Sequence, residues 1–304
     1  MRRSSIIGLG CLALVAVGYA ASMPKFVAPE ALVARSANGA NGEYVFNAAG
    51  CANCHATTGQ DDRLRLGGGY AVKSPFGDFK VPNISSHKTL GIGAWTELQF
   101  VTAMRYGVGR EGQHLFPSFP YTAYQHMTLD DMRDLFAYLT TVPQDGKPSE
   151  PHSLPFPFNV RRAVGLWKQL FFDRPSPPKD ARGTPEIERG AYLVEAMAHC
   201  AECHSGRNPL GAVIPAKRFA GGAEPGSTAW VPNITPHADG LAAWSLRDIE
   251  FLLETGFTPD GVPVGASMGA VIRSTAKLTA SDRKAMAAYL KALPPRPGKK
   301  PAKP

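Results

Sequence analysis

The sequence is short of three things: cysteine, charged residues and long apolar runs. Only 5 of its 304 residues are cysteine, and charged residues make up 19% against 44% hydrophobic. This balance excludes a chain that stays disordered and leaves enough apolar material to bury cores in two domains of ordinary size. The one marked apolar run, Ile6 to Ala21, has 16 residues, whereas a helix that crosses a bilayer needs about 20.

The apolar run has the form of an export signal. Two arginines precede it, and a secretory signal has such a basic start followed by an apolar part of about 7–15 residues. Gly18 and Ala20 form a small-x-small pair, which would allow cleavage after Ala20. We therefore expect residues 1–24 to be a cleaved signal peptide or a retained membrane anchor, with the rest of the chain exported. Cys11 is interpreted as an ordinary apolar member of the run.

The net charge of +8 is carried mainly by the two ends of the chain. The last ten residues hold four basic side chains and no acidic one, so 295–304 is predicted to be a basic, disordered tail. The body between the ends is close to neutral, which argues against a nucleic-acid partner.

Several motifs occur twice at almost the same spacing. Cys51-Ala-Asn-Cys54-His55 recurs 149 positions later as Cys200-Ala-Glu-Cys203-His204. Other pairs lie at offsets of 149 to 151: Val81–Ile84 with Val231–Ile234, Trp95 with Trp244, Gly107 with Gly256, and Ala137–Leu139 with Ala288–Leu290. Self-similarity at one period indicates two copies of a domain. We place these domains at 36–145 and 183–294.

Helix signals agree between the copies, and they predict an all-α fold with long loops. Capping-box patterns predict the starts of a middle and a final helix in each copy: Thr96 with Gln99, Ser245 with Asp248, Thr128 with Asp131, and Thr279 with Asp282. Between the copies lies a Pro-rich linker, 146–182, with a short amphipathic helix expected over 159–172. We expect this helix to pack across both domains, and contact with a membrane or partner subunit is the alternative.

The two Cys-x-x-Cys-His motifs are c-type haem attachment signals. Cysteines three positions apart face one side of a helical turn, so both thiols can bond to the vinyl groups of one haem while the next histidine meets its iron. A disulfide, a zinc site and a redox-active thiol pair are the alternatives, and duplication of the whole motif argues against them. The predicted haem ligands are Cys51, Cys54 and His55 for one haem and Cys200, Cys203 and His204 for the other.

The sixth iron ligand is predicted to be methionine, because histidine–methionine ligation raises the haem potential and suits electron transfer. In the second copy Met268 lies in a Gly-rich stretch that we interpret as a loop across the far face of the haem. In the first copy Met127 is predicted to fill this role, with His126 and His114 as alternatives. The remaining methionines after the haem motifs are assigned to the cores: Met104, Met132 and Met286.

Two further residue types recur beside these motifs. Asn83 and Asn233 each follow a proline, and either a haem propionate or the loop backbone is their expected partner. Trp95 and Trp244 are expected to pack beside the haem edges.

The chain resembles the dihaem class I-type cytochromes c that serve as subunits of bacterial membrane-associated dehydrogenases, including alcohol dehydrogenases and molybdenum hydroxylases. The motifs that carry the resemblance span nearly the whole mature chain: Gly-x-Tyr before each haem motif (Gly42–Tyr44 and Gly190–Tyr192), Val81–Ile84, Gly93–Trp95, Phe119–Tyr124, Pro155–Asn159 and Leu278–Asp282. The resemblance implies two tandem cytochrome c domains. In family members with methionine at the position of Phe119 that residue is the expected ligand, and we carry this role to Met127.

We therefore expect an electron carrier and not a catalyst. It would accept electrons from a periplasmic dehydrogenase and pass them to a quinone, another cytochrome or an oxidase, on the periplasmic side of the bacterial inner membrane. The alternative is a dihaem redox enzyme, peroxidase-like or thiosulfate-oxidising. The former needs an open iron site, and the Cys-ligated form of the latter needs a further cysteine beyond those in the two motifs.

Overall fold

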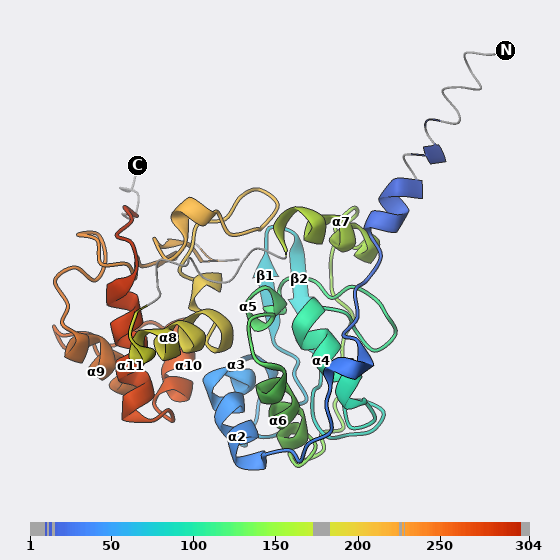
Figure 1. The fold of residues 1–304 in the computed structure, drawn as a ribbon, viewed down its shortest axis with the longest axis horizontal. Helices are drawn as coiled ribbons and strands as arrows, with labels where there is room; N and C mark the ends of the chain where they lie inside the picture. The colour runs from blue at the N-terminus through green and yellow to red at the C-terminus, as the bar shows by residue number, and fades with distance from the viewer. Residues whose placement is uncertain are drawn as a thin grey trace.

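The computed structural model describes residues 10, 12–13, 16–172, 183–224, 227 and 229–298, which form two lobes side by side (Figure 1). Repeat 1 contains η1 (Pro29–Ala31), α2 (Gly39–Ala48), α3 (Cys51–His55), β1 (Ala71–Ser74), β2 (Gly77–Lys80), α4 (Glu97–Tyr106), α5 (Tyr121–Tyr124) and α6 (Leu129–Leu139). Repeat 2 contains α8 (Pro185–Ala191), the π-helical turn η3 (Tyr192–Met197), η4 (Cys200–Glu202), η5 (Pro215–Lys217), β3 (Gly222–Ala223), β4 (Trp230–Val231), α9 (Leu246–Thr255), α10 (Ala266–Thr275) and α11 (Ala280–Ala292). Helix α7 (Arg161–Phe171) lies in the connection.

The framework is helical, as predicted, and the long loops add two small antiparallel hairpins. β1 pairs with β2, with Ala71 opposite Lys80, and β3 pairs with β4, with Gly222 opposite Val231. Both hairpins lie between an attachment motif and the middle helix of the same repeat. They give the long loops partners for some of their backbone groups, which a bare loop would leave to water.

The predicted helix starts are confirmed by their caps. The side chains of the four cap residues each accept a hydrogen bond from the backbone N–H three positions on: Thr96 from Gln99, Ser245 from Asp248, Thr128 from Asp131, and Thr279 from Asp282. α4 and α9 both end at a glycine in the left-handed conformation, Gly107 with φ 59° and Gly256 with φ 81°. The paired glycines of the sequence thus mark helix C-termini.

In each repeat the first helix packs closely against the last one. α2 lies on α6, and α8 lies on α11. A Cβ atom at Gly42 would stand 2.1 Å from the backbone oxygen of Asp134, and one at Gly190 would stand 1.9 Å from that of Ala285. Only glycine permits this approach, so the Gly-x-Tyr motif of both repeats records a helix crossing.

The two repeats face each other through reciprocal contacts. The Tyr44 hydroxyl of repeat 1 donates to Oδ2 of Asp282 at 2.5 Å, and the Tyr192 hydroxyl of repeat 2 donates to Oδ2 of Asp131. Tyr192 follows Tyr44 by 148 positions and Asp282 follows Asp131 by 151, so these are the same contact made twice.

A second reciprocal pair lies at the attachment motifs themselves. Asn53, inside the first motif, donates to Oγ of Ser274 at 3.0 Å, and Glu202, inside the second, accepts from Oγ1 of Thr122 at 2.6 Å. An interface in which each side uses the same patch is the isologous arrangement of twofold dimers. The chain therefore folds as a fused pair of repeats with pseudo-twofold symmetry.

The linker helix lies where the sequence predicts it and contacts both repeats. α7 spans Arg161–Phe171 within the expected 159–172. Its Lys168 ammonium donates to the backbone oxygens of Tyr106 and Gly107, in repeat 1, and its Trp167 Nε1 donates to the backbone oxygen of Leu210, in repeat 2, at 2.9 Å. The prediction that this helix packs across both domains is confirmed.

The ends of the chain differ from expectation at one point. Residues 295–298 do not belong to a disordered tail, because the Arg296 N–H donates to Oγ1 of Thr235 at 3.2 Å and the Arg296 guanidinium donates to the backbone oxygen of Arg218 at 2.8 Å. The rest of the predicted tail, 299–304, lies outside the described residues, as do residues 1–9, 11, 14 and 15 of the predicted signal or anchor. Within the described part of the chain, no helix is long and apolar enough to cross a bilayer.

Candidate haem-attachment sites

Each attachment motif begins at a turn in the left-handed conformation. Gly50, with φ 62°, leads into α3, and His199, with φ 43°, leads into η4. The sharp turn redirects the chain, so that a short helix follows at the end of the preceding helix. The two cysteines of the motif lie one turn apart on this short helix. Glycine adopts this conformation freely, whereas histidine adopts it at a cost.

The four motif cysteines are free thiols in the structure. Burial raises the pKa of Cys51 and of Cys200 to about 12. Redox-active thiol pairs depend on a lowered thiol pKa, so this environment argues against that alternative. Unpaired, protonated thiols are the form available for thioether bonding.

The two motifs lie near each other across the interface between the repeats. His199, which precedes Cys200, packs its ring 5.6 Å from that of Tyr124 of repeat 1. The Tyr124 hydroxyl donates to the backbone oxygen of Ala49, two residues before Cys51, at 3.4 Å. Tyr124 therefore contacts the starts of both motifs, which lie in one region of the molecule.

The imidazoles of both motifs are oriented by a proline carbonyl. Nδ1 of His55 lies 2.9 Å from the backbone oxygen of Pro82, and Nδ1 of His204 lies 2.8 Å from that of Pro232. A carbonyl only accepts, so Nδ1 carries the proton and Nε2 keeps its lone pair for a metal. Burial lowers the pKa of both histidines, which favours the neutral form that binds iron.

The asparagines after these prolines hold loop backbone. Nδ2 of Asn83 donates to the backbone oxygens of Asp145 and Lys147, each at 2.8 Å, and Nδ2 of Asn233 donates to that of Arg296 at 2.7 Å. Of the two expectations for these residues, the structure supports the loop-backbone role. Each asparagine ties the segment beyond the final helix to the Val-Pro-Asn-Ile loop.

Met268 does not lie in a loop, which corrects the local interpretation of its Gly-rich stretch. It stands in the first turn of α10 (Ala266–Thr275), half-buried and packed against the main core. Gly265 is the residue before this helix, with an extended backbone, and Gly269 lies inside it. The glycines of this stretch thus accompany a helix start, and Met268 as an iron ligand stays a prediction.

Met127 is a buried residue just before the Thr128 cap. Its side chain is 1% exposed, and Leu278, which precedes the matching cap in repeat 2, is 4% exposed. The residue 149 positions before Met268 is Phe119, which packs its ring against that of Tyr124 at 5.6 Å. Met127 as an iron ligand stays a prediction, in a position that repeat 2 fills with an apolar side chain.

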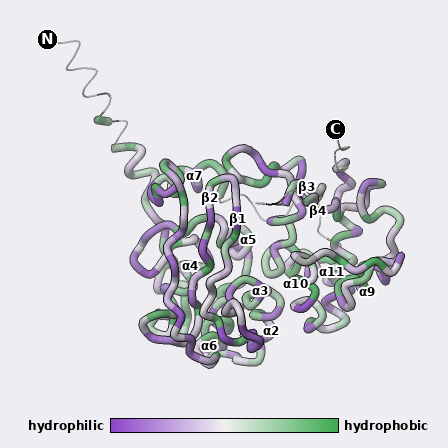
Figure 2. The backbone as a smooth tube through the Cα atoms, turned by 180° about the vertical axis from the view of Figure 1, so that it is seen from behind, coloured by the Kyte–Doolittle hydropathy of each residue, from purple (hydrophilic) through white to green (hydrophobic). Residues whose placement is uncertain are grey.

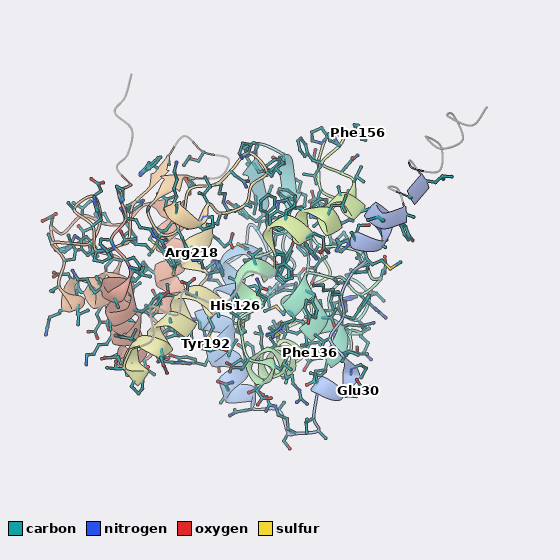
Figure 3. The ribbon with its side chains drawn as sticks, turned by 45° about the horizontal axis from the view of Figure 1, so that its top comes forward. Glu30, His126, Phe136, Phe156, Tyr192 and Arg218 are labelled. Carbon is teal, nitrogen blue, oxygen red and sulfur yellow. The ribbon has the colours of Figure 1, made fainter. Side chains whose placement is uncertain are left out.

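His114 and His126, the alternative iron ligands considered for repeat 1, have other neighbours in the structure. Both ring nitrogens of His114 are engaged, since Nε2 donates to the backbone oxygen of Ser22 at 2.8 Å and Nδ1 accepts from Lys168 at 3.2 Å. His126 is at the junction of the lobes, near Arg218 and Tyr192 of repeat 2 (Figure 3). His114 has no nitrogen left for iron in this conformation.

These residues fit a haem better than any other group considered. Each repeat offers two unpaired thiols and an imidazole whose Nε2 is directed by a hydrogen bond at Nδ1. Across the described residues, no cluster of three or more histidine, cysteine or acidic side chains could hold a metal ion, which disfavours a zinc site. The arrangement defines a protein with two covalently bound haem c groups.

Comparison with known proteins agrees with this definition. The Cytochrome c family model matches residues 39–143 and 187–294, and the chain belongs to this family. It is 42% identical over 297 residues to a diheme cytochrome c-type protein of Cereibacter sphaeroides, covering 97% of this chain and 99% of the relative.

Two further relatives are longer proteins. The chain is 39% identical over 257 residues to the fructose dehydrogenase cytochrome subunit of Gluconobacter japonicus, covering 83% of this chain and 52% of that subunit. It is 34% identical over 268 residues to the cytochrome c subunit of the alcohol dehydrogenase (quinone) of Gluconacetobacter polyoxogenes, covering 84% and 56%. The chain thus spans about half the length of these subunits.

The sequence analysis did not predict the contacts that position the motif residues, and the assignment of those residues to haem attachment stays a prediction. The proline carbonyls behind His55 and His204 and the reciprocal Tyr44 and Tyr192 contacts were not anticipated. A signal for both was present, because Val-Pro-Asn-Ile and Gly-x-Tyr recur at the repeat offset. Residues that recur at the repeat offset without an assigned chemical role therefore indicate contacts that position the site.

Proposed function

We propose that this protein carries electrons between a dehydrogenase and the respiratory chain. It would accept them from a dehydrogenase subunit and deliver them to a quinone, another cytochrome or an oxidase. The names of the relatives support this, because several are cytochrome subunits of dehydrogenases. When bound, haem supplies a one-electron couple at its iron.

The observation that carries the proposal is the pairing of the two attachment motifs across one interface. A carrier needs its two redox centres held at a fixed, short separation, whereas a single-site catalyst does not. The reciprocal contacts of Tyr44 with Asp282 and of Tyr192 with Asp131 hold the repeats in one relative orientation. Asn53 and Glu202, inside the motifs, form part of the same interface.

The ligand set that we propose is His55 and Met127 for one iron and His204 and Met268 for the other. The proline carbonyls keep the proton on Nδ1 of each histidine and so direct Nε2 to the iron. A thioether on the opposite face would raise the potential of each centre. This set supports a carrier, because it leaves neither iron open to a substrate.

We also propose that the protein works on the periplasmic side of the bacterial inner membrane. The basic start and apolar run of residues 1–24 support export. Covalent haem attachment would keep the cofactor with the protein in that compartment.

The test is purification of the full chain from a host that attaches haem c. We expect a mass with two added haems, a far-red methionine–iron band from both, and co-purification of a large dehydrogenase subunit. That dehydrogenase, given its substrate, should reduce both haems. A chain without covalent haem, or one whose haems turn over peroxide and are not reduced by the dehydrogenase, would contradict the proposal.

A further inference from the structure

Large apolar side chains are exposed in several parts of the described chain, and five of them fall between residues 156 and 170. Phe156 is 81% exposed and Leu170 is 65% exposed, and three further apolar residues between them are also exposed. We call this set the α7 apolar face: Phe156, Phe158, Val160, Leu166 and Leu170. Exposed apolar side chains that occur close together in the chain, the most exposed of them an aromatic ring, suggest an interaction site.

Helix α7 has two distinct faces. Val164, Gly165 and Lys168 are buried against repeat 1, whereas Leu166 and Leu170, four positions apart, share the outer side. A Cβ at Gly165 would stand 2.5 Å from the backbone oxygen of Ser22. The inner face is therefore closely fitted, whereas the outer leucines are largely exposed.

The end of the N-terminal apolar run is fixed to the same helix. The guanidinium of Arg162 donates to Oγ of Ser22 at 2.8 Å and to the backbone oxygen of Tyr19 at 3.1 Å, and it lies 4.1 Å from the centre of the Tyr19 ring. Gln169 donates to the backbone oxygen of Ala21 at 2.8 Å. The chain therefore leaves its apolar run at α7.

The described part of this run extends away from the body beside α7 and is mostly hydrophobic (Figure 2). Leu12, Val17 and Tyr19 are exposed along it. Phe156 lies at the outer margin on the α7 side of the molecule (Figure 3). Two apolar surfaces, one on the run and one on α7, thus emerge on the same side of the protein.

The character of this region favours one kind of partner. Residues 151–172 include no acidic side chain, and their basic groups bond to the protein, Lys168 to Tyr106 and Arg162 to Tyr19, which leaves the outer face apolar. An amphipathic helix with aromatic neighbours and an apolar outer face binds at the boundary of a bilayer. A docking surface for a protein partner would need no apolar run beside it. A bilayer, in contrast, accommodates both the run and the α7 apolar face.

We propose that the α7 apolar face rests on a lipid bilayer, inserting its side chains at the level of the headgroups. This inference rests on the proposed location at the inner membrane with the apolar run retained as an anchor, and it adds the surface that faces the bilayer. The apolar run and α7 then contact the same bilayer, and Arg162 and Gln169 set the angle between them. The haem-bearing interface would be held at a fixed orientation to the membrane.

The test uses the full haem-loaded chain on vesicles of phosphatidylethanolamine and phosphatidylglycerol. A nitroxide label is placed by Phe156→Cys in a Cys11→Ser background, and Leu246→Cys on α9 serves as an exposed control position. We expect the label at 156 to become several-fold more accessible to lipid-dissolved oxygen than to a water-soluble nickel chelate, and the label at 246 to be unchanged. A label at 156 that stays in water on bound vesicles, or a chain that does not bind them, overturns the proposal.

A matched pair of variants separates insertion from general effects. Leu166→Glu with Leu170→Glu should move the label at 156 back into water on vesicles, and Leu246→Glu should not. Dehydrogenase-driven reduction of the haems is measured in parallel, because its loss in wild-type protein would contradict the proposed function and leave the vesicle result standing. If the double variant keeps the label in lipid but loses co-purification with the dehydrogenase, the face binds protein and the membrane proposal is wrong.

Discussion

The two repeats position the motif histidine and pack against each other with equivalent residues, and they differ at a few positions. Both direct a histidine with a proline carbonyl, both seat a Gly-x-Tyr helix on the final helix, and both close the interface with a tyrosine and an aspartate. What the repeats share is therefore what haem attachment and pairing require. What they do not share shows where each repeat is specialised.

Three differences lie at or near the predicted haem sites. Phe119 stands at the offset position of Met268, Leu278 stands at that of Met127, and His199 replaces Gly50 before the first cysteine of the motif. A fourth lies at the interface, where Arg189 holds Asp282 through two hydrogen bonds and Asn41 holds Asp131 through one. Each difference gives a substitution that exchanges the residue of one repeat for that of the other.

The largest effect is expected from Met268→Leu. Leucine preserves the volume of the methionine side chain and removes its thioether sulfur, the atom of that side chain that would bind iron. We expect the iron of repeat 2 to bind carbon monoxide, to lose its far-red band, and to fall in potential by on the order of 100 mV. Unchanged spectra and potentials for both haems would show that Met268 is not a ligand.

Met127→Leu copies the residue that repeat 2 uses at this place. Since Leu278 is buried in the same position before its cap, the fold should accept leucine with a loss of less than about 1.5 kcal/mol. If Met127 is the ligand, the far-red band of the haem of repeat 1 disappears and the iron of that haem becomes open to carbon monoxide. A variant with two intact bands would make Met127 a packing residue like Leu278 and leave the ligand in repeat 1 to be found elsewhere.

The pseudo-twofold interface predicts two matched losses. Tyr44→Phe and Tyr192→Phe each remove one hydroxyl that donates to a carboxylate, and each should cost about 1–2 kcal/mol of unfolding free energy. Arg189 bonds the Asp282 that Tyr44 contacts and lies 5.9 Å from the centre of the Tyr192 ring, so the two sites are coupled and the loss in the double variant should differ from the sum. Denaturant unfolding followed by circular dichroism measures this, and a loss at only one site would contradict the symmetry.

The stability that Asp282 contributes at the interface is expected to depend on pH. Although burial opposes it, hydrogen bonds from Arg189 and Tyr44 lower the pKa of Asp282 below its usual value. A carboxyl with a lowered pKa in the folded state stabilises that state above its unfolded pKa, and this contribution is lost as the pH falls through the folded pKa. Arg189→Asn, which copies Asn41, should therefore destabilise the protein most near neutral pH, and its difference from wild type in denaturant unfolding should shrink as the pH falls.

The sequence predicted the helices and their caps well because those signals are local. Thr96, Thr128, Ser245 and Thr279 each bond to a backbone group three positions away, and no distant contact is needed to specify that. The attachment motifs are equally local signals, because their chemistry depends on spacing within five positions, and the assignment of their residues stays a prediction.

The sequence could not predict contacts between distant segments. The tie of Asn233 to Arg296, which orders residues 295–298, depends on where the chain returns after α11. Met268 was placed in a loop because glycines beside it suggest irregular backbone, yet α10 forms there against α9. In both cases tertiary packing decided a structure that local composition left open.

The smallest effect is expected at the turn before the second motif. His199 holds a left-handed backbone, with φ 43°, at a cost of roughly 1 kcal/mol, and its ring lies 5.6 Å from that of Tyr124 in repeat 1, a contact worth about as much. His199→Gly removes both terms, so we expect a change in unfolding free energy of less than about 1 kcal/mol. The reverse exchange, Gly50→His, gains no matching partner, and a Cβ there would stand 2.7 Å from Nδ2 of Asn53. We expect it to cost about 1–2 kcal/mol, and equal effects from the two exchanges in denaturant unfolding would show that the Tyr124 contact does not offset the strained turn of repeat 2.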